Sequence, residues 1–117
     1  RKARLLAVSR VMLNPGLVGL GILDSFVCRV PMLTTDCGLH SPEISYLENW
    51  ANGLITPDSM ESYVQAVVGV LRDDTLHARL VAGCEQSCKR YSIENMAQLF
   101  AQGVARCFSS PIAPGKR

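Results

Sequence analysis

Helical periodicity dominates the second half of the chain. Three successive segments carry apolar residues at the i, i+3, i+4, i+7 spacing that one face of a helix requires. Asp58 and Glu61 form a box-like start for the first segment, the second follows the Asp73–Asp74 break, and Ser92 is placed to cap the third. The expected core-facing positions of the first helix are Met60, Tyr63, Val64, Val67, Val68 and Leu71.

Short β-rich runs alternate with helical segments in the first half. Val11–Leu13 is predicted to be a strand that Asn-Pro terminates, and Val30–Asp36 and Leu54–Thr56 have the same strand-like character. An apolar helix is expected from Leu20 to about Arg29, and a short helix over 42–48 begins with a serine N-cap and a proline. This alternation predicts an α/β fold with parallel strands and right-handed crossovers.

The number of strands predicts only part of a Rossmann-like domain. A complete doubly wound sheet has about five or six strands, whereas about three are expected here, so the pattern fits the second half of such a domain. We expect a three-layer α/β/α unit with a short parallel sheet and C-terminal helices over residues 1–108, followed by a flexible tail at 109–117. The first strand would then expose an edge that a partner should cover.

Composition and charge exclude several classes of protein. The 117 residues are enough for one domain, and 48% of them are hydrophobic. The net charge of +2 comes from scattered lysines and arginines without a basic stripe, which argues against a nucleic-acid partner. The apolar runs are too short for a transmembrane segment or a signal-peptide core, so a cytoplasmic protein is expected.

The cysteines give no signature of a metal site. The chain has five, an odd number, without a CxxC pair and without a histidine at ligand spacing. Cys84 and Cys88 stand one helical turn apart, but a metal would need two further ligands from elsewhere. We expect reduced, mostly structural thiols and no bound metal or other cofactor.

The loop "NPGLVG" after the first strand is the candidate binding site. In open parallel sheets a ligand lies beyond the carboxyl ends of the strands, where this loop falls. Gly16 and Gly19 permit close backbone approach, and the amides of Val18, Gly19 and Leu20 would lie at a helix N-terminus that favours a phosphate. The simpler alternative is that the glycines only make a tight turn between strand and helix.

Asp24 is the one acid in the apolar helix that follows this loop. A buried, unpaired carboxylate is costly, so Asp24 should be exposed, capping, or hydrogen-bonded to a partner. Two ribose hydroxyls suit a carboxylate acceptor, as they do in dinucleotide folds. An exposed acid that the helix dipole stabilises is the equally acceptable alternative.

The order of motifs resembles a known family. The run "NPGLVGLGILDSFVCRVPMLTTDCGLHSPEI" together with "NGLITPD" and "YSIENM" is similar to the C-terminal, donor-binding half of group 1, family 4 glycosyltransferases. The similarity extends over roughly residues 5–108 and lies in the order and spacing of the motifs. It implies a GT-B fold, in which two Rossmann-like domains are paired.

The resemblance also implies an activity and roles for named residues. Such enzymes transfer a sugar from a nucleotide-diphosphate donor with retention and without an obligatory metal. By position, the amides of Val18, Gly19 and Leu20 would hold the diphosphate and Asp24 the ribose. Pro15 and Gly16 would line the space near the donor sugar.

This sequence departs from the family pattern at three places. Gly16 stands where the family commonly has a first acidic residue, and Arg29 replaces the glycine usual before the second strand. The family's basic residues for the diphosphate, and its acceptor domain, lie upstream of this chain. No catalytic residue is therefore assigned, and the isolated chain is expected to be inactive.

A different class of function stays open on the sequence. The chain could be a stand-alone, non-catalytic module that binds a nucleotide ligand or another protein. Either a missing N-terminal domain or a homodimer mate is expected to cover an apolar stripe that includes Met96, Phe100 and Val104. His40 is interpreted as a loop residue that could cap the next helix, and Trp50 as a residue packed on its loop unless it proves exposed.

Overall fold

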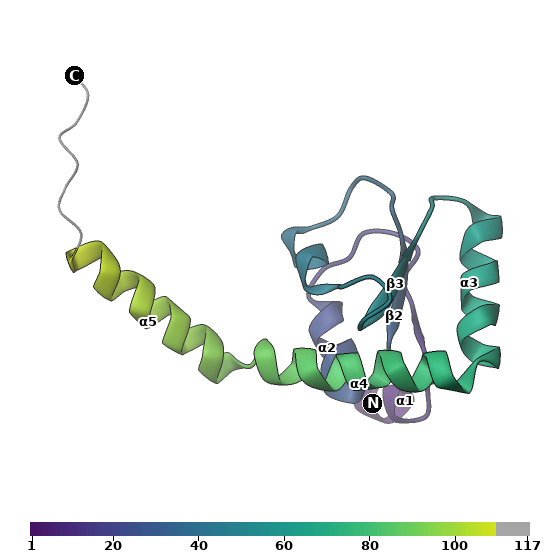
Figure 1. Cartoon of the computed structure of the whole chain (residues 1–117), viewed down its shortest axis with the longest axis horizontal. Coiled ribbons are helices and arrows are strands. Elements are labelled where there is room, and N and C mark those ends of the chain that lie inside the picture. Colours follow the sequence, from purple (N-terminus) through teal and green to yellow (C-terminus); the bar gives the residue numbers. More distant parts are fainter. Residues whose placement is uncertain (110–117) are drawn as a thin grey trace, which may run out of the picture.

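The computed structural model describes residues 1–109, which form an α/β unit with one helix extending from it (Figure 1). The expected tail at 109–117 lies outside the described residues, apart from Ser109, which ends the last helix. The elements in chain order are α1 Lys2–Ala7, β1 Met12–Leu13, α2 Gly21–Cys28, β2 Met32–Thr35, the 3-10 helix η1 Pro42–Tyr46, β3 Gly53–Thr56, α3 Met60–Arg72, α4 Asp74–Arg90 and α5 Ile93–Ser109.

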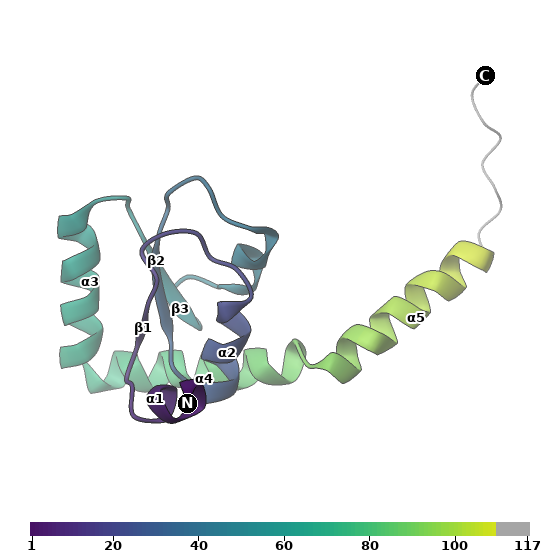
Figure 2. The same ribbon diagram turned by 180° about the vertical axis from the view of Figure 1, so that it is seen from behind.

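The three strands form one parallel sheet in the order β1-β2-β3. Met32 pairs with Met12 on one side and with Gly53 on the other, so β2 is central and β1 lies at an edge. Figures 1 and 2 show α2 and α3 on opposite sides of the strands, with α4 running past both. The expected three-layer architecture with a short parallel sheet is confirmed.

Two hydrophobic clusters lie on the two faces of the sheet. Successive side chains of a strand point to opposite faces, so Met32 joins the α2 side and Leu33 the α3 side. Helix α4 contributes Leu80 to one cluster and Cys84 to the other, which ties the layers together. The clusters are Val18, Ile22, Phe26, Met32, Leu47 and Cys84, and Leu33, Leu54, Tyr63, Val70 and Leu80.

Helix α3 differs from the sequence prediction in its cap and its buried face. Its N-cap is Ser59, whose side chain accepts a hydrogen bond from the Ser62 amide, and not Asp58. Tyr63 and Val70 are buried, whereas Met60 is 80% and Val64 49% exposed. The helix has apolar residues on more than one face, and the sheet covers only one of them.

Helix α5 extends away from the sheet, as Figures 1 and 2 show. Ser92 caps it by accepting a hydrogen bond from the Asn95 amide, as expected. Met96, Phe100 and Val104 are 63%, 74% and 41% exposed, so the expected exposed apolar stripe is confirmed. A pocket of about 520 Å³ separates the start of α5 from Leu23 and Tyr46.

The cysteines are all free thiols, and Cys84 is fully buried. Burial raises the pKa of the Cys84 thiol to about 12, so this group stays protonated. Within residues 1–109, no group of three or more histidine, cysteine or acidic side chains could hold a metal ion. No helix in this part of the chain has the length and apolar character needed to cross a membrane.

The loop before β3 packs tightly on α4. Asn52 is buried, and its side chain accepts from the Glu48 amide at 2.8 Å and donates to Tyr46 O at 2.9 Å and Ser87 Oγ at 2.8 Å. A Cβ atom at Gly83 would stand 1.9 Å from the Ala51 carbonyl oxygen. Glycine at position 83 is therefore a requirement of this contact.

Arg29 ends α2 in the left-handed conformation, with φ 57° and ψ 40°. The Val30 amide donates to Ser25 O at 2.9 Å, which closes the helix end. The guanidinium forms a largely exposed ion pair with Glu85 at 3.0 Å. The sequence predicts strain at this position, because Arg29 stands where the family that the chain resembles usually has glycine.

Replacing Arg29 with glycine should stabilise the protein. Glycine adopts the left-handed conformation without strain, so Arg29→Gly is expected to raise the free energy of unfolding by about 1 kcal/mol in urea titrations. Arg29→Ala is the matched control, because it retains the Cβ and loses only an exposed ion pair worth roughly 0.5 kcal/mol. Equal stability of the two variants would contradict the strain.

The two helical glycines Gly83 and Gly69 should respond in opposite directions to alanine. Gly83→Ala forces a Cβ into the Ala51 carbonyl and is expected to cost at least about 2 kcal/mol of unfolding free energy. Gly69 lies inside α3 with open space around its Cβ position, so Gly69→Ala should gain about 0.5–1 kcal/mol. A stabilising Gly83→Ala would refute the close contact.

Candidate functional site

The loop from Asn14 to Leu20 joins β1 to α2 at the carboxyl ends of the strands. The Asn14 amide donates to Leu33 O at 2.9 Å, which continues the β1–β2 pairing by one residue. The chain then turns over the end of the sheet and enters α2, as Figure 2 shows. The loop therefore lies at the sheet edge where parallel α/β folds bind their ligands.

Four successive carbonyl groups of this loop are bound by the protein itself. Thr35 Oγ1 donates to the Pro15 carbonyl at 2.7 Å, and Thr34 Oγ1 to the Gly16 carbonyl at 3.2 Å. The Leu17 carbonyl accepts from Asn14 Nδ2, and the Val18 carbonyl from the Ser41 amide, both at 3.2 Å. These partially negative oxygens are thereby turned toward protein donors.

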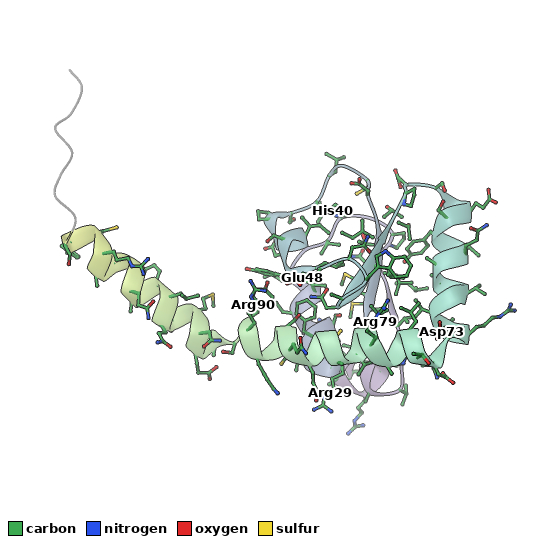
Figure 3. All side chains as sticks on the ribbon, viewed as in Figure 1. Arg29, His40, Glu48, Asp73, Arg79 and Arg90 are labelled. Atoms are coloured by element: carbon green, nitrogen blue, oxygen red, sulfur yellow. The ribbon has the colours of Figure 1, made fainter. Side chains whose placement is uncertain are left out.

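His40 joins the loop to the end of β2. Its Nδ1 accepts a hydrogen bond from the Val18 amide at 3.1 Å, and its Nε2 lies 2.8 Å from the Thr35 carbonyl. This arrangement requires the neutral tautomer with the proton on Nε2. Figure 3 places His40 above the strands, on the η1 side. His40 thus positions the loop and does not cap η1, and the Val18 amide is already in use.

The amides of Gly19 and Leu20 stand at the N-terminus of α2. No side chain caps this helix, and neither amide has a hydrogen-bond partner in residues 1–109. Leu20 is 67% exposed, so the backbone here is open to solvent. Two unused donors at the positive end of a helix dipole favour an anion.

Asp24 lies on the first turn of α2, and its side chain is 44% exposed. It forms an ion pair with Lys2 of α1, which is 22 residues away in the sequence. Asp24 is thus a partly exposed, paired acid and not a buried one. Sequence reasoning missed Lys2, because nothing local indicates that α1 packs beside α2.

Pro15 and Gly16 border the open end of the sheet. A pocket of about 130 Å³ lies between Pro15, Thr35, Asp58 and Tyr63, smaller than the roughly 300 Å³ that ligand pockets commonly reach. The Tyr63 hydroxyl donates to Leu33 O at 2.9 Å, and burial raises the pKa of Tyr63, so it is not a base. Nothing lies within 4 Å of a Cβ at Gly16.

Trp50 lies at the other end of the sheet. It precedes β3, whereas the loop follows β1, so the two lie at opposite ends of parallel strands. Its side chain is 55% exposed and its φ is 66°. A nucleotide held by the loop therefore does not have Trp50 beneath its base.

Comparisons with solved structures support this fold. Three structures of HepE from Anabaena, in complex with UDP, with UDP-glucose, and with UDP and glucose, are similar to the chain at TM-scores of 0.72, 0.70 and 0.70. Sequence identity is 16% in each, over 88%, 88% and 87% of this chain.

The chain spans only 29%, 29% and 28% of the length of those three HepE chains. No protein-family model matches the chain, and no curated protein matches its sequence. The likeness to HepE therefore establishes the fold of this chain.

Removing the His40 ring should loosen the loop without unfolding the sheet. In His40→Ala the Val18 amide loses its acceptor, so its hydrogen exchange measured by NMR should accelerate about fivefold, as expected for a bond worth on the order of 1 kcal/mol. The Val30 amide, which donates to Ser25 O, is the internal reference. Leu39→Ala, at a 76% exposed neighbour, should leave both amides unchanged.

Proposed function

We propose that this chain is the donor-binding portion of a retaining glycosyltransferase and holds a nucleotide-diphosphate sugar at the loop between β1 and α2. The observation that carries the proposal is the pair of unpartnered amides of Gly19 and Leu20 at the start of α2. Similarity to HepE, a protein crystallised with UDP and UDP-glucose, supports the same ligand class.

The diphosphate is proposed to bind the Gly19 and Leu20 amides. A helix N-terminus with free N–H groups is a suitable anion site, and here the carbonyls of residues 15–18 already have protein donors. The Val18 amide would join only after releasing His40 Nδ1. The sequence predicts three equivalent amide donors. In the structure two of them, those of Gly19 and Leu20, are open, and the third, that of Val18, is bound to His40.

Asp24 is proposed to accept hydrogen bonds from the ribose hydroxyls. It must first release Lys2, but an ion pair between side chains that are 68% and 44% exposed contributes little. Replacing Lys2 by the ribose hydroxyls at Asp24 therefore costs little free energy. Lys2, once released, is a cation beside a bound diphosphate, which favours the same ligand.

Pro15 and Gly16 are proposed to lie near the donor sugar. Gly16 has no side chain at a position where the family that the chain resembles commonly has an acidic residue. Donor binding is therefore better supported than catalysis. The charge of a leaving diphosphate must be stabilised, and an acceptor must be positioned. We therefore propose that the chain alone is inactive and that an N-terminal acceptor domain or a homodimer mate completes the site.

A non-catalytic module is the second candidate function. The exposed apolar stripe of α5 and the open edge at β1 favour a protein that binds a nucleotide or a partner without turnover. A donor-hydrolysis assay separates the two: turnover restored by an added acceptor domain supports the enzyme, and binding without any turnover supports the module.

A proline at position 20 tests the phosphate site directly. Leu20 has φ −57°, which proline accepts, and its amide makes no internal bond, so Leu20→Pro removes one proposed donor with little strain. UDP binding, followed by calorimetry and thermal shift, should weaken by about tenfold for the loss of one charge-assisted hydrogen bond. Leu20→Ala keeps the amide and should bind UDP like the unmodified chain.

The ribose role of Asp24 has its own test. Asp24→Asn should weaken UDP binding without weakening the binding of inorganic pyrophosphate, because pyrophosphate has no ribose and the substitution leaves Lys2 free to attract it. If Leu20→Pro and Asp24→Asn both bind UDP as tightly as the unmodified chain, the proposed donor site is wrong.

A further inference from the structure

Trp50 combines three features that its packing does not explain. It is the single tryptophan of the chain, its side chain is 55% exposed, and its backbone is left-handed at φ 66°. A bulky aromatic residue is unfavourable in that conformation, where glycine or asparagine is preferred. The strain costs roughly 1–2 kcal/mol, and strain of this kind gathers at functional positions.

The turn that carries Trp50 is built rigidly. The Trp50 amide donates to Gly53 O and the Ala51 amide to Glu48 O, both at 2.9 Å. The Ala51 carbonyl rests on the bare backbone of Gly83 in α4. The backbone of Trp50 is therefore held in place, so a ligand that uses the indole does not have to order the turn.

Polar side chains surround the ring, and those of Arg79 and Gln86 make no hydrogen bond within the described residues. Two adjoining hollows of about 280 and 450 Å³ share Trp50 and Arg79, and the larger also includes Asn49 and Gln86. Arg79 is exposed and makes no ion pair or hydrogen bond within residues 1–109. Figure 3 shows Arg79 on α4, with Asp73 farther toward the start of that helix.

We propose that this surface binds a carbohydrate chain, with the C–H face of one pyranose ring stacked on the Trp50 indole. Arg79 and Gln86 supply hydrogen-bond donors to hydroxyl groups, and Gln86 also supplies an acceptor. An anionic ligand is not favoured, because Asp73 offsets the charge of Arg79 in the smaller hollow. A flat aromatic face bordered by amide and guanidinium groups matches the alternating apolar and hydroxyl surfaces of a sugar.

This surface is separate from the donor loop. The two lie at opposite ends of the strands, so a sugar chain at Trp50 and a nucleotide at Gly19 and Leu20 do not compete. The inference therefore stands whether or not the loop binds a nucleotide sugar.

Because Trp50 is the single tryptophan of the chain, its fluorescence reports directly on ligand binding at this surface. Maltohexaose, cellohexaose and mannitol are titrated into the full chain while the indole emission is followed. At least one hexasaccharide should shift the emission saturably, with a dissociation constant on the order of 1 mM. Mannitol, which has no ring face, should have no effect, and 1 mM UDP should leave the titration unchanged.

Variants test the same binding by saturation-transfer NMR, which needs no tryptophan. Trp50→Gly relieves the left-handed backbone, which offsets the lost packing of the ring, so it should remain folded in urea titrations and yet bind the hexasaccharide at least tenfold more weakly. Trp50→Phe should retain part of the affinity, Arg79→Ala should lose part, and Leu39→Ala at a distant exposed position should lose none. The proposal is overturned if no hexasaccharide binds saturably, if UDP displaces it, or if Trp50→Gly binds as the unmodified chain does.

Discussion

Strand β2 is the element on which the rest of the structure depends, because all four of its residues are buried between two helical layers. Met32 packs toward α2 and Leu33 toward α3, so the two hydrophobic clusters meet on two adjacent residues of one strand. Thr34 and Thr35 follow, and their buried hydroxyls donate to the carbonyls of Gly16 and Pro15. The same short strand thereby joins the core and positions the candidate binding loop.

That loop is a candidate site built mainly from backbone groups. Its carbonyl groups are held by threonine, asparagine and backbone donors, and His40 holds the Val18 amide, while the amides of Gly19 and Leu20 stay open at the start of α2. A surface of this kind presents positive partial charge without a lysine or arginine. It suits a phosphate group, and it contributes little to catalysis by itself.

Two residues with left-handed backbones illustrate different uses of strain. Arg29 ends α2, where a glycine would serve better, and its side chain forms only an exposed ion pair with Glu85. Trp50 has the same backbone hand, but its ring borders two hollows and lies on a turn that Asn52 and Gly83 hold in place. At Arg29 the strain is a simple loss of stability, and at Trp50 it accompanies the surface proposed to bind a carbohydrate.

The sequence by itself determined the α/β class, the three parallel strands and the helical order, because periodicity, proline and capping residues act over a few neighbouring positions. It also located the loop after β1, the left-handed position of Arg29 and the apolar stripe of α5. Only the tertiary structure decided that Lys2 pairs with Asp24, that His40 occupies the Val18 amide, and that α3 buries Tyr63 and Val70 but leaves Met60 exposed. Each of these depends on which elements pack together, and packing is set by contacts between residues distant in sequence, which no local pattern encodes.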